Sequence, residues 1–275
     1  LSALAQGKAA GTTGYTSKVL KTGQTTQYNS ELDDGYYEAG VAKSYTINTT
    51  GAQSGTTNVD LAHYVGGAGA IAFNNSTKKI TDSGNGLAIF KTNDVILTSS
   101  ASNPGPFTVT TGNVAGEIVC SGATFTDETP AGAVTISKRE AISNNTVLDN
   151  NTGLEWMRTI SVKFGVASNG KMPWYNTIYD IFQWCAAVNL ASVGGHNDWR
   201  VPNWRESLSI VNAAYGYLDS TAFPTNYASG VYWTSSTQDG YNPSKHQIEL
   251  GYPRLKSDNY AGNFLCFRLV RGGLS

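Results

Sequence analysis

The sequence predicts an α+β protein in which an all-β section precedes a section with two short helices on a β-sheet. Composition is the first reason: 30 glycines and 15 tyrosines among 275 residues, with many Thr, Ser and Asn, are typical of strands joined by tight turns. The second is that apolar residues recur at helical spacing in two stretches between residues 176 and 215. A chain of this length accommodates two domains.

The N-terminal residues and the overall charge bear on possible partners. Residues 1–12 are small and polar, and we expect an arm that orders against another chain. Charged residues make up only 14% of the chain and the net charge is −1, so we expect no nucleic-acid partner. The sequence contains no apolar run of membrane-spanning length, and its start is too weakly apolar for a secretory signal, so we expect no membrane insertion.

Short β-rich runs of similar spacing fill residues 41–137. They are separated by turns rich in Gly, Pro and Asn, and none has a helical period. This series predicts an immunoglobulin-like β-sandwich, although any other sandwich would give a similar pattern. The runs are 43–47, 70–73, 86–90, 94–98, 106–110, 117–121 and 133–136.

Residues 147–157 predict two strands joined by an Asn-rich turn, because Leu154 and Trp156 alternate after it. We expect the strand at 264–270 to pair with residues 154–157. A helix is predicted from a cap at Asn176 to about residue 190, with apolar residues at 178, 181, 182, 185 and 188.

A second helix is predicted after Pro202. Asn203 with Glu206 three residues later indicates a capping box, and the expected inner stripe is Leu208, Val211 and Tyr215. Both helices are expected to pack on the sheet formed by the strands around them.

The stretch 231–271 is predicted to present a surface. Apolar strand-like anchors at 231–233 and 264–270 bracket a polar middle rich in Tyr, Ser, Gly, Asn and Asp. Adaptable binding surfaces use this composition to combine rigid aromatic area with flexible hydrogen bonding.

The cysteines leave two alternatives open. Cys120, Cys185 and Cys266 are an odd number without metal-binding spacing, so three buried thiols, or one disulfide and a free thiol, fit the sequence. We favour three buried thiols.

Four motifs resemble, in order and spacing, the Legionella collagen-like C-terminal domain family. They are Asn-Thr-Gly-Leu-Glu-Trp at 151–156, Gly-His-Asn-Asp-Trp-Arg-Val-Pro at 195–202, Tyr-Trp-Thr-Ser-Ser at 232–236 and Phe-Arg-Leu-Val-Arg-Gly-Gly at 267–273. The resemblance implies a C-type lectin fold over residues 139–275. The segment at 22–36 is similar to what precedes this domain in the family, which implies that residues 1–40 include the first part of the body and that 41–138 are an insertion.

The overall plan resembles the variable proteins of diversity-generating retroelements in phages and archaeal viruses. In those proteins, error-prone copying at adenines diversifies the C-terminal coding stretch, while core strands hold the exposed positions. The resemblance implies that Ile248 and Leu250 face the core. It also implies that the varied, ligand-contacting positions are Asp239, Tyr241, Asn242, Ser244, His246, Gln247, Glu249, Tyr252, Arg254, Ser257, Asp258, Asn259 and Tyr260.

Several residues have both a structural and a functional interpretation. Trp156, Trp199 and Trp233 could stack on sugars, but we expect them to fill the core. Arg200 and Arg271 are expected to pair with Asp198 or Glu155 rather than with a ligand.

Two functional alternatives rest on other motifs. Residues 197–199 have some likeness to a calcium-ligating lectin strand, but no second loop of oxygen ligands accompanies them, and we expect no metal. A formylglycine-generating oxidase shares the implied fold but needs a reactive cysteine pair, whereas Cys266 is alone near the C-terminus.

The function predicted from the sequence is a receptor-binding protein without cofactor or catalytic activity. The expected partner is a protein or glycan on a host surface, and the expected location is a virion surface, such as a tail fibre, or the extracellular space. Multivalent display as a trimer would raise a weak affinity per site. A fixed carbohydrate-binding lectin, an enzyme of the oxidase type and a purely structural spacer are the alternatives.

Overall fold

The computed structural model describes residues 42–159, 171–175, 178–212, 217–224, 231–237, 245–249, 254–258 and 264–272. Within these residues the protein is mainly β-sheet with two α-helices, which confirms the predicted mixture of elements. The expected arm at 1–12 and the segment at 22–36 lie outside the described residues. None of the described helices has the length and apolarity that crossing a bilayer requires.

The C-terminal part of the chain, which we call the body, contains two main sheets. The first has the order β1-β9-β10-β18, from Tyr45–Asn48, Thr146–Asp149, Leu154–Met157 and Val270–Gly272. The second has the order β11-β17-β14-β15-β16, from Lys171–Pro173, Phe264–Cys266, Val231–Thr237, Lys245–Glu249 and Arg254–Asp258. The remaining elements are η1 (Gly51–Gln53), α2 (Ile181–Leu190), η3 (Val193–Gly195), α3 (Trp204–Ile210), β12 (Val211–Asn212) and β13 (Tyr217–Leu218).

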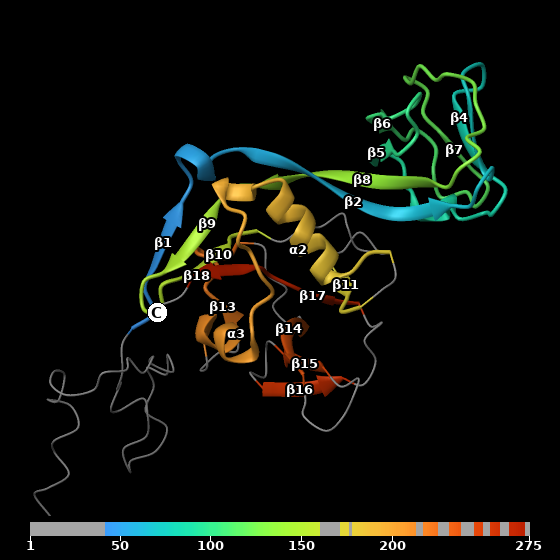
Figure 1. Ribbon diagram of the computed structural model, residues 1–275. Helices are drawn as coiled ribbons and strands as arrows, with labels where there is room; N and C mark the ends of the chain where they lie inside the picture. The colour runs from blue at the N-terminus through green and yellow to red at the C-terminus, as the bar shows by residue number, and fades with distance from the viewer. Residues whose placement is uncertain are drawn as a thin grey trace, which may run out of the picture.

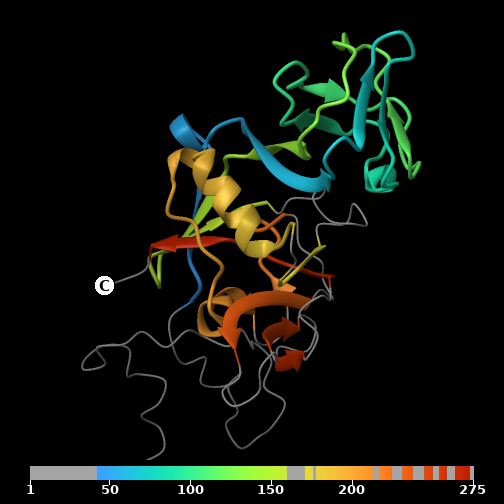
Figure 2. The ribbon, with the colours of Figure 1, turned by 45° about the vertical axis from the view of Figure 1, so that its right-hand side comes forward.

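The β-rich section forms two further sheets around one core, which extends away from the body in both views (Figures 1 and 2). Ile80, Ile96 and Ile118, which come from both sheets, are fully buried in this core. The sheet orders are β2-β8-β5-β6 and β3-β4-β7. The strands are Thr56–Gly66, Val134–Ser143, Val95–Thr98 and Phe107–Thr108, then Ile71–Asn74, Lys79–Asp82 and Glu117–Val119; η2 spans Leu87–Ile89.

Strands β2 and β8 make a ribbon that belongs to both parts (Figure 1). Its body end supplies Val59, Leu61 and Ile142 to the core beneath α2, whereas Val134 and Ile136 lie in the core of the β-rich section. Because alternate residues of a strand point to opposite faces, one ribbon can present apolar side chains at both ends. The two cores are therefore joined by continuous hydrogen-bonded backbone.

One of the predicted β-rich runs belongs to a different sheet than expected, and another is not a strand. The run at 43–47 was expected in the sandwich, but β1 pairs with β9 of the body, Tyr45 opposite Asp149. Tyr45 and Ile47 pack against the body core, which explains this pairing. The run at 86–90 contains η2 instead of a strand, with Leu87 fully buried. The boundaries 41–138 and 139–275 stay predictions.

Helix α2 begins later than predicted. Its N-cap is Asp180, whose side chain accepts hydrogen bonds from the backbone N–H groups of Phe182 and Gln183, both at 2.9 Å. The cap predicted at Asn176 was wrong, and Ile178 precedes the helix. Asn176 itself lies outside the described residues.

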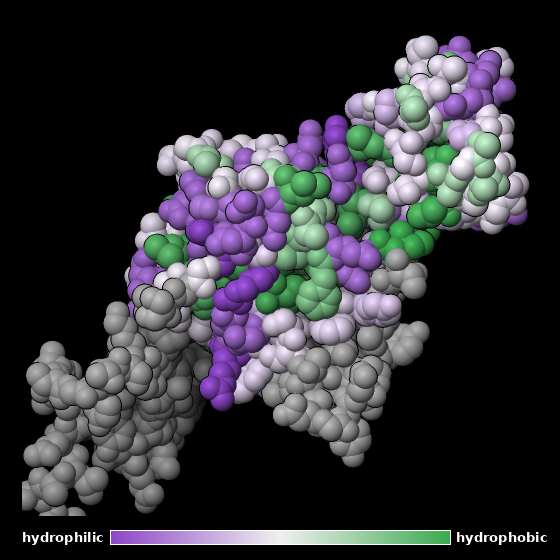
Figure 3. Space-filling model, viewed as in Figure 1, coloured by the Kyte–Doolittle hydropathy of each residue, from purple (hydrophilic) through white to green (hydrophobic). Residues whose placement is uncertain are grey.

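The exposed side of α2 is apolar. Phe182 and Leu190 are 39% and 90% exposed, and no residue from Ile181 to Leu190 carries a charge. Figure 3 shows a green band along this helix. The described residues leave this apolar strip uncovered.

The capping box predicted for α3 is confirmed. Glu206 N–H donates to Asn203 Oδ1 at 3.0 Å, and Asn203 N–H donates to Glu206 Oε2 at 2.8 Å. The predicted inner stripe was too long, because the helix ends at Ile210 and Val211 begins β12. Tyr215, the last residue of that stripe, lies outside the described residues.

Lys43 closes the other end of α3. Its Nζ donates to the carbonyls of Ser209 and Val211, both at 2.6 Å. These are among the carbonyls that a helix leaves unpaired at its C-terminal end. The segment that leads into β1 is thereby tied to the body.

The strand predicted at 264–270 was wrong as one element, because it is split between the two sheets. β17 pairs with β11 and, in parallel, with β14, whereas β18 pairs with β10. Residues 154–157 thus have the expected C-terminal partner only at Val270–Gly272. The hairpin at 147–157 is confirmed, and its turn uses Gly153 at a φ of 69°, which favours glycine.

We predict that Asn203→Ala lowers the free energy of unfolding by about 1 kcal/mol, because it removes one half of the capping box. Asn203→Ser keeps a cap acceptor and should stay within about 0.5 kcal/mol of the native protein. Equilibrium unfolding in urea, followed by circular dichroism, measures both. Equal losses for the two variants would contradict a capping role.

Candidate binding surface

Six of the predicted ligand-contacting residues lie on a hairpin at one edge of the five-stranded sheet. His246, Gln247 and Glu249 are on β15, and Arg254, Ser257 and Asp258 are on β16, which is last in the sheet order. The other predicted positions lie outside the described residues: Asp239, Tyr241, Asn242, Ser244, Tyr252, Asn259 and Tyr260, together with the expected core residue Leu250.

The register divides these six predicted residues between the two faces of the hairpin. Successive residues of a strand alternate between faces, and residues that lie opposite each other in an antiparallel pair share a face. One face receives three polar pairs, Lys245 with Asp258, Gln247 with Lys256 and Glu249 with Arg254. Two of these pairs combine opposite formal charges. The hairpin therefore has one face composed of polar positions.

The opposite face of the hairpin is the one that the register shares with Tyr232 of β14. His246 pairs with Ser257, and Ile248 pairs with Leu255. Ile248 also pairs with Tyr232 of β14, which is 7% exposed and belongs to the core around Trp156. The register thus places Ile248 on the same face as Tyr232, and it places Gln247, which pairs with the buried Trp233, on the other face. That Ile248 faces the core stays a prediction.

Strand β14 is held rigidly beside this hairpin. Trp233 is 1% exposed, and its Nε1–H donates to the carbonyl of Met172 at 2.9 Å. Trp174 Nε1–H donates to the carbonyl of Thr234 at 2.9 Å, and Ser235 N–H donates to the carbonyl of Pro202 at 2.8 Å. Hydrogen bonds with Met172, Trp174 and Pro202 therefore fix the strand that carries the hairpin.

The three tryptophans of the motifs fill the core, as predicted. Trp156, Trp199 and Trp233 are 1%, 2% and 1% exposed. Asn189 holds the backbone of Trp199 by accepting from its N–H and donating to its carbonyl, both at 2.8 Å. None of these three rings offers a face on which a sugar could stack.

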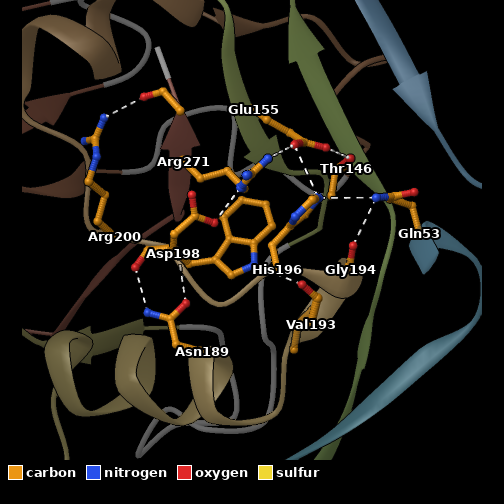
Figure 4. A network of polar contacts seen from close by, with 12 residues as sticks. Gln53, Thr146, Glu155, Asn189, Val193, Gly194, His196, Asp198, Arg200 and Arg271 are labelled. Carbon is orange, nitrogen blue, oxygen red and sulfur yellow. Dashed lines mark hydrogen bonds and ion pairs between the residues drawn. The ribbon is translucent and has the colours of Figure 1, made fainter. Parts of the chain in front are cut away.

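Arg271 joins two motif segments through two carboxylates (Figure 4). Its Nε donates to Asp198 Oδ1 and its Nη1 donates to Glu155 Oε2, both at 2.6 Å. This outcome confirms the predicted pairing of Arg271. Asp198 belongs to residues 197–199, which have some likeness to a calcium-ligating strand, and its carboxylate is bonded to the Arg271 guanidinium.

Glu155 is the most buried carboxylate of this network, at 8% exposed. Thr146 donates to its Oε1, and Asn48 Nδ2 lies 3.3 Å from the same oxygen. Burial raises the pKa of Glu155, but the hydrogen bonds from Thr146 and Arg271 outweigh burial and hold that pKa below its ordinary value. The ionised carboxylate is therefore the native form.

Gln53 and His196 extend the network to the base of the ribbon. His196 Nε2 lies 3.5 Å from Glu155 Oε2 and 3.3 Å from Gln53 Nε2, and Gln53 Nε2 also donates to the carbonyl of Gly194 at 3.0 Å. Gln53 ends η1, and the ribbon strand β2 begins three residues later at Thr56. Nothing in the sequence around Gln53 indicated this role.

Arg200 does not pair as predicted. Its guanidinium binds Glu206 through two hydrogen bonds of 2.7 and 2.6 Å instead of binding Asp198 or Glu155. Because Glu206 also closes the capping box, this ion pair fixes the start of α3 to the motif at 195–202. Glu206 lies in the first turn of α3, and from there its carboxylate reaches the Arg200 guanidinium.

Arg268 is a core residue that sequence reasoning missed. It is 3% exposed and donates through Nη1 to the carbonyls of Met157 and Arg158, at 2.5 and 2.7 Å. Its Cζ lies 4.8 Å from the ring centroid of Phe223, and burial lowers its pKa to about 10. An arginine between two apolar residues, Phe267 and Leu269, was the available signal.

The three cysteines are buried free thiols, as we favoured, and none of them forms the disulfide that the sequence had left open. Cys120 and Cys266 are fully buried and Cys185 is 8% exposed. Burial raises the pKa of each thiol to about 11. Such thiols are poor nucleophiles near neutral pH. Among the described residues, no three His, Cys, Asp or Glu side chains gather as a metal site would require.

We predict that the contribution of Glu155 to stability is complete above its unfolded-state pKa and is lost as the pH falls through its lower folded-state pKa. Glu155→Gln should flatten this acid branch and lower the free energy of unfolding at pH 7 by about 2 kcal/mol, because Arg271 loses a largely buried partner. Urea unfolding from pH 3 to pH 7 measures both effects. The matched control is Glu117→Gln, which breaks a partly exposed pair with Lys79 and should change little. An unaltered acid branch in Glu155→Gln would contradict the prediction.

We also predict that the native protein does not react measurably with a chromogenic thiol reagent at pH 8 over several minutes. After unfolding in guanidinium chloride, all three thiols should react, because burial no longer suppresses the thiolate. Rapid reaction of one equivalent in the native state would identify an accessible thiol and contradict the buried arrangement.

Comparison with known proteins supports the family resemblance for the C-terminal section only. No curated protein and no solved structure matches the chain. Residues 145–271, which contain the Arg271–Glu155–Asp198 network and the hairpin β15–β16, match the model of the Lcl C-terminal domain.

Proposed function

We propose that this protein is a ligand-binding protein whose contact surface is formed by the hairpin β15–β16, the end of β14 and the loops between them. The observation that carries the proposal is the register of this hairpin, which collects three polar pairs on one face at the edge of a sheet whose neighbouring strand is fixed. The family match at 145–271 is compatible with a ligand-binding or adhesion-type domain.

The proposal includes a C-type lectin fold for the body and diversification by a retroelement. A buried frame and an edge hairpin suit that mode of evolution, because exposed positions change with little effect on stability while buried ones do not. The sequence plan described above supports it as well. The receptor would be a protein or glycan on a host surface, contacted from a virion or in the extracellular space.

We also propose that the protein has no catalytic role and acts as an oligomer. Cys266, the residue that an oxidase mechanism would use, is fully buried in the strand β17. The uncovered apolar strip along α2 supports contact with a second copy of the chain. A monomer in sedimentation velocity would contradict the proposed trimer.

A fixed carbohydrate-binding lectin is the second candidate. It is less well supported, because Trp156, Trp199 and Trp233 are buried and the Asp198 carboxylate is held by Arg271. Stacking on an exposed ring would be the usual basis of sugar binding.

A pair of displayed libraries tests the proposal. The surface library randomises Gln247, Glu249, Arg254 and Asp258, and the matched frame library randomises Thr146, Glu155, Asp198 and Arg271. The proposal makes these four positions solvent-facing, and exposed substitutions change stability by about 0.5 kcal/mol each, so we predict that most members of the surface library unfold within a few degrees of the native protein. Panning this library against a purified test protein should yield binders.

Most members of the frame library should fail to fold, because they leave buried charges without partners. Equal loss of folded protein in the two libraries would contradict the proposal, as would a folded surface library that yields no binders.

A further inference from the structure

We infer that Arg205, stacked on Trp204, is a fixed carboxylate-binding point beside the proposed contact surface, and that it takes an acidic segment of a receptor protein. This inference rests on the proposed function, which it deepens by naming a ligand chemistry. Neither residue is among the positions expected to vary.

The two side chains form one unit at the start of α3. Arg205 Cζ lies 5.3 Å from the ring centroid of Trp204, a distance at which a guanidinium is attracted to an indole face. Arg205 is exposed, whereas Trp204 is half-buried and packs against the core that contains Tyr232 and Ile210. A ring anchored in the core thus holds an exposed cation in place.

The unit lies next to the proposed contact surface. Trp204 N–H donates to Ser236 Oγ at 3.2 Å, and α3 packs against both β14 and β15 (Figure 1). Thr237, the next residue of β14, pairs with Lys245 at the start of β15. The start of α3 therefore lies beside Ser236, two residues before the segment 238–244, which contains four of the predicted contact residues.

The other arginines with described side chains already have partners in the protein. Arg139, Arg200 and Arg271 bind carboxylates, and Arg158 and Arg268 bind backbone carbonyls. Within the described part of the chain, no carboxylate or carbonyl binds the guanidinium of Arg205. Toward the described residues its N–H donors are therefore unoccupied, and we assign them to a ligand.

A planar guanidinium binds a carboxylate through two parallel hydrogen bonds, which an ammonium cannot do. Stacking on Trp204 orders the side chain in advance, so that less rotamer freedom is lost on binding. Arg205 also covers a face of the indole, and that face is not offered to a sugar ring. These points favour a carboxylate on a protein, and Trp and Arg are the residues most enriched at energetic centres of protein interfaces.

The test uses acetylated tetraglutamate amide as the probe, titrated into the 275-residue chain and followed by NMR at the Trp204 indole and Arg205 Nε–H signals. We expect saturable shifts at both signals and a dissociation constant about fivefold higher in Arg205→Gln, which corresponds to an exposed ion pair. Arg205→Lys should also bind more weakly than the native protein, because it keeps the charge but loses the fork. Arg139→Gln, on the ribbon, removes the same charge elsewhere and should bind like the native protein.

Three results would overturn the inference. They are the absence of shifts with tetraglutamate, equal affinity of Arg205→Gln and Arg139→Gln, and equal binding of the neutral tetraglutamine amide. Binding of tetragalacturonate without binding of tetraglutamate would overturn the assignment to a protein ligand. Because this titration leaves the randomised hairpin positions unchanged, its failure is distinguishable from failure of the surface library.

Discussion

The C-terminal body depends on one guanidinium that is shared by two carboxylates. Arg271, Glu155 and Asp198 come from three segments that are far apart in the sequence, and the two bonds from Arg271 are both 2.6 Å long. A fork with fixed donor directions specifies the position of both carboxylates at once. Glu155 then orients Thr146 and His196, and His196 lies against Gln53 at the base of the ribbon. Three of the four motifs that carry the family resemblance, at 151–156, 195–202 and 267–273, thus meet in one network.

This network has consequences for both functional parts of the molecule. The motif at 195–202 fixes α3 through the Arg200–Glu206 pair, and it fixes β14 through the carbonyl of Pro202. On the opposite side, η1 and the ribbon β2–β8 connect it to the β-rich section. Buried charges that pair correctly are poor sources of stability compared with apolar packing, but they specify one arrangement of segments. The proposed diversification of the hairpin requires such a constant frame.

Local signals in the sequence predicted part of this structure. The capping box at Asn203, the Asn-rich turn before Leu154 and the burial of three tryptophans follow from short-range patterns, and each is confirmed. The start of α2 was wrong because Asn176 and Asp180 are both capable caps, and packing selects the second. The division of 264–270 between two sheets follows from pairing with β11 and β10, which local periodicity does not encode. The same applies to β1, whose partner is about 100 residues away.

For the candidate site, too, short-range sequence patterns predicted only part of the structure. The composition of 231–271 indicated a polar, presented surface, and the pairing of Arg271 could be predicted from charge and burial. The distribution of polar residues over the two faces depends on which residues of β15 and β16 are opposite each other, and a shift of one residue would exchange the faces. The stacking of Arg205 on Trp204 similarly depends on how α3 packs beside β14.

The central claim is that a constant frame carries a diversified contact surface. Its most direct test is deep sequencing of this coding region across one natural population. The account predicts substitutions concentrated between residues 238 and 260, at codons whose adenines match a nearby template copy. Glu155, Asp198, Trp233 and Arg271 should be constant, as should Trp204 and Arg205. An invariant hairpin without a second copy of its coding sequence, or equal variation in the frame and the hairpin, would contradict the account.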